Sequence, residues 1–283
     1  MFCYQRSFGL PTEVVTLEQF RALITAPGTI RKVKEAREAL ARGDKNAYDR
    51  KKKGLPLAIF IGTFEESVKV MKDKNTGEEK SVTGCWRLQK HCRLNGLCVI
   101  GFDHVEGDVR KVWDEAFAKL SDEDKARVLF VFVTPSGHGL KVVFIADAAV
   151  GNLIDNQIVF SMKLGLNPDE ACKDASRGAF LTTSEDIIFI DEERLISYQD
   201  DAFGEKYNEA YHQGHSQPTI TNTDKTNTNN TNLTNNEAQE NSCNSSHSCS
   251  EKENSCNSGN SCSEKKYLGV PIQTIIETWS KQR

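Results

Sequence analysis

The sequence predicts an α/β (α+β) domain in which helices pack on a mixed sheet, followed by a disordered linker. Short apolar runs typical of buried strands alternate with segments whose apolar residues recur at helical spacing, and together they predict the domain. The linker is predicted by a stretch rich in Asn, Ser and Cys with almost nothing to bury. We therefore expect a folded domain over residues 1–205, a disordered linker over 206–266 and the start of a further helical domain at 267–283.

Composition and cysteine usage indicate the cellular compartment of the protein. Its 283 residues carry a formal net charge of −4 and contain no apolar run near the ~20 residues needed to span a bilayer. The first residues lack the basic-then-apolar plan of a signal peptide. Nine cysteines are an odd number and do not form a disulfide framework, which suits a reducing compartment. These features predict a cytoplasmic protein with no membrane partner.

Two helices and a strand are predicted in the first part of the chain. Thr16 can cap a short helix, and a second helix follows Thr29. The basic run at residues 50–53 is most often a solvated helix end. Residues 57–61 read as a buried strand, and polar residues around 75–77 predict a turn between two exposed segments. The apolar residues expected to be buried in the two helices are Phe20, Leu23, Ile24, Ile30, Val33, Ala36 and Leu40.

The next part of the chain has the most regular pattern. Continuous apolar runs favour strands inside a sheet, and apolar residues at helical spacing favour helices packed on it. The predicted elements are, in order, strand 97–100, helix 109–120, strand 128–133, strand 142–145, helices 154–162 and 169–173, and strand 187–190.

The predicted linker contains a tandem repeat. NSCNSSHSCSEKE at 241–253 is followed by NSCNSGNSCSEKK at 254–266. Its cysteines and His247 could suggest a metal site, but their spacings are wider than those of a zinc knuckle, so a duplicated linker is the favoured interpretation. After the repeat, Pro271 stands where a helix could start, and an apolar stripe follows it.

Asp103 is the first candidate for a chemical role. It stands at the carboxyl end of the strand predicted over residues 97–100, where α/β folds often place ligand-binding groups. A carboxylate there can hold a divalent metal ion through oxygen. The alternative is a strand-end Asp that caps the following turn.

The second candidate is a glycine-containing hairpin between two apolar strands. Gly137 and Gly139 flank His138 and allow close backbone approach, so that amides and the Ser136 hydroxyl can cradle a phosphate. Lys141 lies just inside the returning strand and adds a positive charge. The alternative is an ordinary hairpin.

Asp174 and Arg177 form the third candidate, after a short predicted helix. Asp174 could be a second metal carboxylate, and the guanidinium of Arg177 could bind a phosphate through two hydrogen bonds. The alternative is a surface ion pair of small energetic value.

In this order the three segments resemble the archaeo-eukaryotic primase superfamily, the primase-polymerases. The similarity is greatest to the primase-like domain that precedes VirE-type or helicase domains in mobile elements of Bacteroidetes. It covers roughly residues 45–200 and the restart at 267. The matching strings are LNGLCVIGFDHV, VFVTPSGHGLKVVF and DEACKDASRGAFL, with lesser support from KKKGLPLAIFIGTF and YLGVPIQTIIETW.

The resemblance implies an RRM-like primase-polymerase catalytic core that binds nucleotide and Mg²⁺ or Mn²⁺. Asp103 matches the second acid of the family's Asp-x-Asp metal motif, and Asp174 matches the third acid. Lys141 falls at a catalytic position where many relatives have a His. Ser136, with the Gly137-His138-Gly139 turn that follows it, matches the nucleotide-phosphate loop. The resemblance places Arg177 beside the incoming nucleotide.

One position departs from the family pattern. Gly101 stands where the first acid of the Asp-x-Asp pair is expected. Two-metal phosphoryl transfer needs carboxylates that hold both ions ~3.5–4 Å apart, so the departure removes one bridging ligand. Glu106 or Asp108 could substitute from the following turn.

Two hypotheses follow from this pattern. The first is a nucleotidyltransferase domain of a mobile-element replication protein that makes or extends primers on DNA. Its partners are a DNA template, nucleoside triphosphates and a helicase-like or VirE-type domain. The second is a catalytically inactive relative that acts as a nucleic-acid-binding or replisome-docking module. Gly101 favours the second hypothesis, whereas the retained Asp103, Lys141, Asp174 and Arg177 favour the first.

Overall fold

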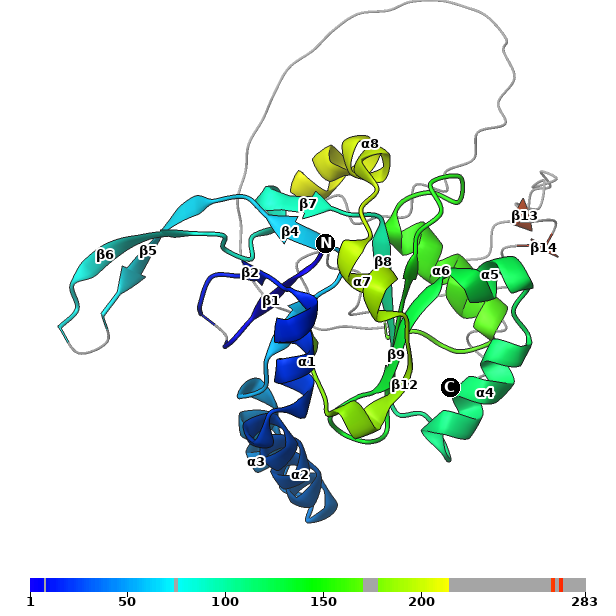
Figure 1. Ribbon diagram of the computed structural model, residues 1–283, viewed down its shortest axis with the longest axis horizontal. Helices are drawn as coiled ribbons and strands as arrows, with labels where there is room; N and C mark the ends of the chain where they lie inside the picture. Colours follow the sequence, from blue (N-terminus) through cyan, green and yellow to red (C-terminus); the bar gives the residue numbers. More distant parts are fainter. Residues whose placement is uncertain (8, 74–75, 170–177, 214–265, 268–269, 272–283) are drawn as a thin grey trace, which may run out of the picture. The chain divides into compact units, whose positions relative to one another are not determined.

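Four apolar strands form the central sheet of the computed structural model, which describes residues 1–7, 9–73, 76–169, 178–213, 266–267 and 270–271 (Figure 1). They are β8 (Leu97–Phe102), β9 (Val128–Val133), β10 (Leu140–Ile145) and β12 (Ile187–Ile190), in the spatial order β12-β9-β10-β8. All three pairings are antiparallel. The predicted combination of helices and sheet is confirmed, in its α+β form, but the expectation of a mixed sheet is wrong, because every strand of this sheet runs against its neighbours.

Helices cover one face of this sheet. They are α4 (Val109–Ala118), α5 (Asp122–Arg127) and α6 (Leu153–Leu164). Asp108 caps α4, Ser121 caps α5 and Asn152 caps α6. On this face the rings of Phe144 in β10 and Phe160 in α6 stack with centroids 4.0 Å apart.

A second sheet, in the order β11-β3-β1-β2, packs against the other face. Its strands are β1 (Cys3–Gln5), β2 (Glu13–Val14), β3 (Leu57–Ile59) and β11 (Ala179–Phe180), all antiparallel. Aromatic rings fill the space between the sheets. The ring of Phe60 lies 5.7 Å from that of Phe130 and 6.4 Å from that of Phe132, both in β9. All three side chains are buried, so this cluster joins the two sheets into one core.

Three helices lie near the start of the chain. The first is α1 (Leu17–Thr25), and Thr16 caps it with a capping box completed by Gln19, as predicted for the cap. The second, α2 (Pro27–Ala41), begins at a proline three residues before the predicted start. The third is α3 (Lys45–Lys53), which packs on α2 through Ala36, Ala39 and Tyr48. The expectation that Ile30 is buried is wrong: it is 47% exposed.

A hairpin extends from the second sheet. Its strands are β5 (Ser67–Lys72) and β6 (Glu79–Gly84) (Figure 1). Of the predicted turn at residues 75–77, Asn75 lies outside the described residues, and the Gly77 amide donates to the Asp73 carbonyl at 2.9 Å. At its base β4 (Gly62–Phe64) pairs with β7 (Cys92–Leu94), which follows a 3₁₀ turn at Gln89–His91. The cation of Lys69 lies 5.0 Å from the ring centre of Trp86 and anchors this base.

The folded unit continues past the predicted boundary at residue 205. After a 3₁₀ turn (Ser184–Asp186) come α7 (Glu192–Ser197) and α8 (Asp201–His212). Tyr207 and Tyr211 of α8 are buried, and the Asn208 side chain accepts a hydrogen bond of 2.9 Å from the Leu94 amide. Most of the predicted linker, residues 214–265, lies outside the described residues.

The chain divides into two units, residues 1–225 and 226–283. In the second, β13 (Lys266–Tyr267) pairs with β14 (Val270–Pro271). Pro271, predicted to begin a helix, ends a short strand, and residues 272–283 lie outside the described part. No helix among the described residues combines the length and the apolar character needed to cross a membrane.

Candidate functional site

Asp103 and Lys141 lie on neighbouring strands at one end of the central sheet. Asp103 is exposed and follows the last residue of β8, while Lys141 in β10 is directly opposite the buried Gly101. Because alternate residues of a strand face the same side, Gly101, Asp103 and Lys141 share one face. Lys141 is also paired with Phe132, whose ring packs against Phe60, so this is the face turned toward the second sheet.

The predicted phosphate loop is the tight turn between β9 and β10. Gly137 has a φ of +82°, which the absence of a Cβ permits, and its amide donates to the Thr134 carbonyl at 2.8 Å. The Ser136 hydroxyl lies 3.0 Å from the Thr134 hydroxyl and accepts a hydrogen bond of 3.2 Å from the His138 amide. The turn is therefore held by its own hydrogen bonds, and Ser136 is central to them.

The loop that follows Asp103 is attached to this turn. The Val105 amide donates to the His138 carbonyl at 2.8 Å. His104 between them has a φ of +56°, a backbone conformation that non-glycine residues seldom adopt. Asp103, Lys141 and the Ser136–His138 turn thus lie at the same end of the sheet.

Gly139 has a packing role instead of the phosphate-binding role that the sequence predicts. A Cβ at this position would come within 2.7 Å of the Thr134 hydroxyl oxygen and 3.0 Å of the Phe102 carbonyl oxygen. The space beside Gly139 is thus filled by the end of β8. Gly139 lets the turn close against that strand, and its missing side chain leaves no room for a phosphate.

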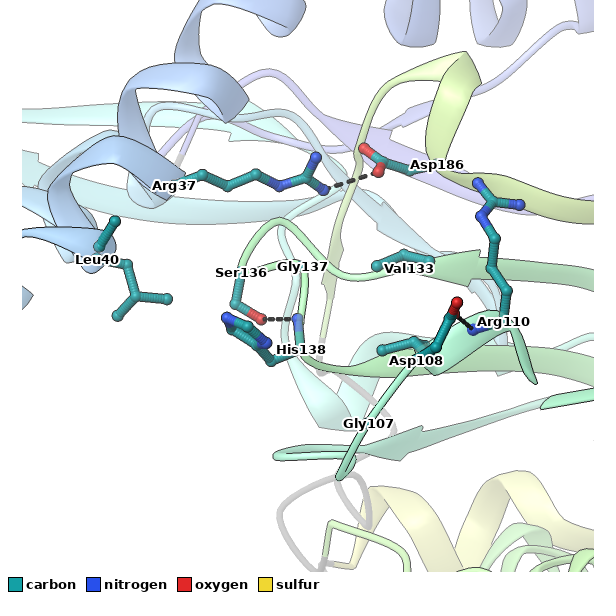
Figure 2. A pocket seen from close by; sticks show the side chains of 12 residues that line it. Arg37, Leu40, Gly107, Asp108, Arg110, Val133, Ser136, Gly137, His138 and Asp186 are labelled. Carbon is teal, nitrogen blue, oxygen red and sulfur yellow. Dashed lines mark hydrogen bonds and ion pairs between the residues drawn. The ribbon is translucent and has the colours of Figure 1, made fainter. Parts of the chain in front are cut away.

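A pocket of about 580 Å³ opens beside the turn, within the range of small-molecule sites (Figure 2). Ser136, Gly137 and His138 line one side of it. Across the turn it is bounded by Arg37 from α2 and Arg110 from α4, with Leu40, Asp108 and Asp186 among the other lining residues.

The two guanidinium groups are held in place by protein oxygens. Arg37 pairs with Asp186 through a 2.8 Å contact and also donates to the Thr134 and Pro135 carbonyls at 3.4 and 3.3 Å. Arg110 donates to the Ile187 carbonyl at 3.3 Å and to that of Glu185. Arg37 is therefore fixed against the turn itself, with its charge shared with one carboxylate.

Tyr48 of α3 is a further residue of the site. Its hydroxyl lies close enough to the Ser136 side chain to interact with it. Burial is the main cause that raises the pKa of this phenol, and the nearby charges of Asp49 and Asp103 add to it, so the group is a neutral hydroxyl at physiological pH. Tyr48 is the only aromatic residue of a very polar helix, which was a usable signal that sequence reasoning missed.

Asp108 and Glu106, the possible substitutes for the missing acid, are placed less favourably. Asp108 caps α4, where it accepts from the Arg110 amide at 2.9 Å, so its carboxylate is engaged away from Gly101. Glu106 is exposed in the loop. Asp174 and Arg177 lie outside the described residues. The Asp169 amide donates to the Gly101 carbonyl at 2.7 Å, which places the chain five residues before Asp174 against the edge of β8.

The donor set fits a divalent cation only in part. Mg²⁺ is commonly held by one or two carboxylates together with substrate phosphates, and Asp103 offers one exposed carboxylate. Among the described residues, no three His, Cys, Asp or Glu side chains gather as a metal-binding group. Comparisons of the sequence with protein-family models and curated proteins, and of the structure with solved structures, give no match.

Proposed function

We propose that this chain is a primase-polymerase-like nucleotidyltransferase domain of a mobile-element replication protein. The observation that carries the proposal is the pocket on the Ser136–His138 turn, which lies at the same end of the sheet as Asp103 and Lys141. Two guanidinium groups, a hydroxyl and a glycine turn line it, and these are groups that bind phosphate. A nucleoside triphosphate is the ligand that fits this chemistry.

Each residue has a distinct part in the proposed site. Ser136 and the amides of its turn contact phosphate oxygens, and Arg37 and Arg110 bind them as charged donors. Lys141, opposite Gly101, adds a positive charge on the face that carries Asp103. Asp103, with Asp174, would hold Mg²⁺ or Mn²⁺. When bound, such an ion would neutralise phosphate charge and lower the pKa of an attacking hydroxyl.

The order of the first elements supports an RRM-like core. The chain runs β8, α4 and α5, β9, β10 and α6, and β10 lies between β8 and β9, as the first half of a split βαβ motif requires. The last strand departs from that motif, because β12 follows β11 of the second sheet and lies beside β9 instead of β8. The proposed partners are a DNA template and, beyond the linker, a helicase-like or VirE-type domain, in the cytoplasm.

One observation favours the second hypothesis, an inactive relative that binds nucleic acid or docks to a replisome. Gly101 is buried within β8, faces Lys141 across the strands and has its carbonyl engaged by Asp169. A carboxylate is therefore missing at a position integrated into the sheet. Under this hypothesis the pocket still binds nucleotide but does not support transfer.

Nucleotide binding tests the proposal before catalysis does. Titration of the full chain with a fluorescent dATP analogue and Mn²⁺ should show saturable binding that Ser136→Ala weakens. Loss of one neutral hydrogen bond is worth about 0.5–1.5 kcal/mol, or roughly two- to thirteenfold in affinity.

Ser197→Ala is the matched control, because the Ser197 hydroxyl only donates to the Glu193 carbonyl within α7. Ser136→Thr should restore part of the affinity by restoring a hydroxyl. No binding by the wild-type chain, or equal binding by folded Ser136→Ala, would refute a nucleotide pocket here.

A further inference from the structure

The α2–α3 helical hairpin concentrates positive charge in an acidic protein. Residues 27–53 contain ten Lys and Arg against four Asp and Glu, whereas the whole chain has 36 against 40. Three of these cations are turned inward: Lys32 donates to the Gly54 carbonyl, Arg37 pairs with Asp186, and Lys52 lies over the Tyr48 ring. The other seven are exposed, namely Arg31, Lys34, Arg42, Lys45, Arg50, Lys51 and Lys53.

Local pairing accounts for little of this charge. Glu35 is the partner of both Arg31 and Lys51, and the Lys51 hydrogen bond is the main cause that lowers the pKa of Glu35. Of the other acids, only Glu38 and Asp44 are exposed, and Asp44 caps α3. Cations in the last turn of α3 also favour its helix dipole. That effect does not reach Arg31, Lys34 or Arg42 on α2.

The chemistry of this surface suits a phosphate backbone. Arg31 and Arg42 are eleven residues apart on and just beyond α2, about 16 Å along the helix, which matches roughly five base pairs of duplex DNA. Tyr48, the one aromatic residue of the two helices, is buried, so no ring is offered for base stacking. Ile30 is the one large apolar side chain exposed on them, so they lack the apolar face of a membrane-surface helix.

The α2–α3 hairpin also forms part of the pocket wall. Arg37 and Leu40 of α2 line it, and Figure 2 shows the Arg37 side chain reaching from this helix over the Ser136–Gly137 turn. Tyr48 of α3, in the same hairpin, also interacts with the Ser136 side chain. A strand bound along the exposed side of α2 and α3 would thus lie next to the bound nucleotide.

We propose that the α2–α3 hairpin is the surface on which this domain holds the sugar-phosphate backbone of its DNA, without reading sequence. The inference rests on the proposed function for the identity of the nucleic acid. It deepens that function by placing the template or primer strand on helices that precede the central sheet in the chain.

Fluorescence anisotropy with a short labelled DNA, measured over a range of salt concentrations, tests the inference on the full chain. The variant Arg42→Gln/Lys45→Gln/Arg50→Gln removes three exposed cations. Each lost phosphate contact should flatten the slope of log affinity against log salt by about 0.9, which is about eightfold in affinity between 1 M and 0.1 M salt. We expect at least that loss at 0.1 M salt, equal for DNAs of different sequence.

The control is Lys72→Gln/Lys80→Gln/Lys119→Gln, which makes the same change in net charge at exposed lysines elsewhere. It should bind DNA like the wild type. Wild-type affinity and slope in the α2–α3 variant would overturn the inference, as would no DNA binding by the wild type. Binding to phosphatidylserine vesicles that the α2–α3 variant loses, with DNA binding unchanged, would also overturn it.

Loss of nucleotide binding in Ser136→Ala is a separate readout. If the α2–α3 variant loses DNA affinity but the pocket binds no nucleotide, the surface stands and the proposed activity fails. If the pocket binds nucleotide and the variant still binds DNA normally, the surface fails and the activity stands.

Discussion

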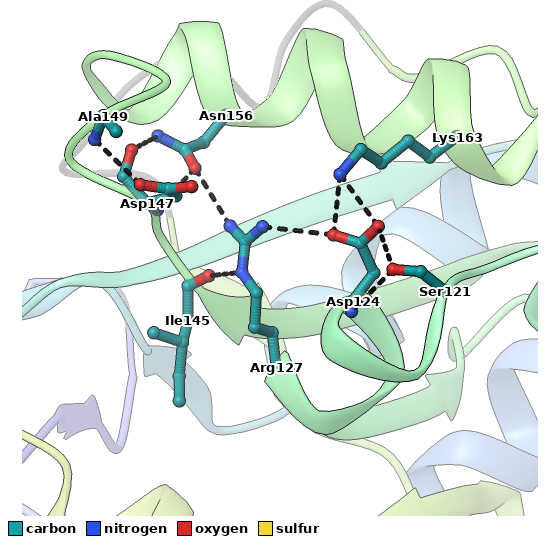
Figure 3. Close-up of polar contacts among 8 residues, drawn as sticks. All are labelled: Ser121, Asp124, Arg127, Ile145, Asp147, Ala149, Asn156 and Lys163. Atoms are coloured by element: carbon teal, nitrogen blue, oxygen red, sulfur yellow. Dashed lines mark hydrogen bonds and ion pairs between the residues drawn. The ribbon is translucent and has the colours of Figure 1, made fainter.

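Asp124→Asn tests how the helical layer is fixed to the central sheet. Asp124 in α5 is only 6% exposed and accepts from the Lys163 ammonium at 2.7 and 2.8 Å, from the Ser121 hydroxyl at 2.9 Å and from Arg127 at 3.3 Å (Figure 3). Arg127 also donates to the Ile145 carbonyl of β10 at 2.9 Å and to the Asn156 side chain of α6 at 3.2 Å. One carboxylate thus connects α5, α6 and β10.

The expected loss follows from the exposure of its two cationic partners. Removing one member of a buried ion pair costs about 3–5 kcal/mol, because the other charge stays buried. The Lys163 side chain is 41% exposed and can turn to water, so the loss of its ion pair contributes only about 0.5–1 kcal/mol to the destabilisation. Arg127 is 15% exposed but keeps two other acceptors. We expect a total near 2–3 kcal/mol, or a fall in Tm of about 4–12 °C for a domain of this size.

The loss should also depend on pH. Burial acts to raise the pKa of Asp124, but hydrogen bonds from Lys163 and Ser121 and the charges of Lys163 and Arg127 outweigh it and hold the pKa below its usual value. A lowered native pKa stabilises the fold above about pH 4 and ceases to do so as pH falls through the native value. The stability difference between wild type and Asp124→Asn should therefore shrink below pH 4.

Urea unfolding at several pH values, followed by circular dichroism, measures this. Lys163→Met is the matched comparison, since it removes only the exposed partner and should cost no more than about 1 kcal/mol. A loss below about 0.5 kcal/mol for Asp124→Asn at pH 7 would refute the reasoning, as would a loss that stays constant down to pH 3.

Three further predictions concern the site and the linker. Gly139→Val should lower Tm sharply, because its side chain would meet the Thr134 hydroxyl and the Phe102 carbonyl; an unchanged Tm would contradict the packing role. Gly101→Asp should raise Mn²⁺-dependent nucleotidyl transfer if the domain is an enzyme weakened at this position. Folded Gly101→Asp protein that binds Mn²⁺ more tightly without any transfer would favour the binding module. Brief proteolysis and intact-mass analysis should give a stable fragment ending between residues 213 and 240, and protection of residues 222–262 would contradict the linker prediction.

The sequence predicts individual elements well where the pattern is local. The apolar run at 128–133 is strand β9 with the same bounds, and Thr16 caps α1 as predicted. Turn chemistry at residues 135–139 locates the hairpin for the same reason, because a short glycine turn needs no distant partner.

Strand order and long-range partners are not encoded in such local patterns. A continuous apolar run indicates that both faces of a strand are buried. It does not indicate which strands are its neighbours or in which direction they run, so the sequence does not predict the antiparallel order of the central sheet. Arg37 reaches the carbonyl of Pro135, 98 residues later in the chain, and no spacing rule connects the two. Helical periodicity predicts that Ile30 lies on the apolar face of its helix, but it does not predict how much of that face the neighbouring elements cover. Ile30 therefore stays exposed.

The central claim is that the pocket beside the Ser136–His138 turn serves nucleotidyl transfer at Asp103. Primer-extension and de novo priming assays with Mn²⁺, comparing the wild type with Asp103→Asn, test it most directly. The account predicts DNA product from the wild type and none from a folded Asp103→Asn protein that keeps the wild-type Tm. Equal product from both would contradict the role of Asp103, and no product from a wild type that binds nucleotide would contradict the enzyme and leave the binding module.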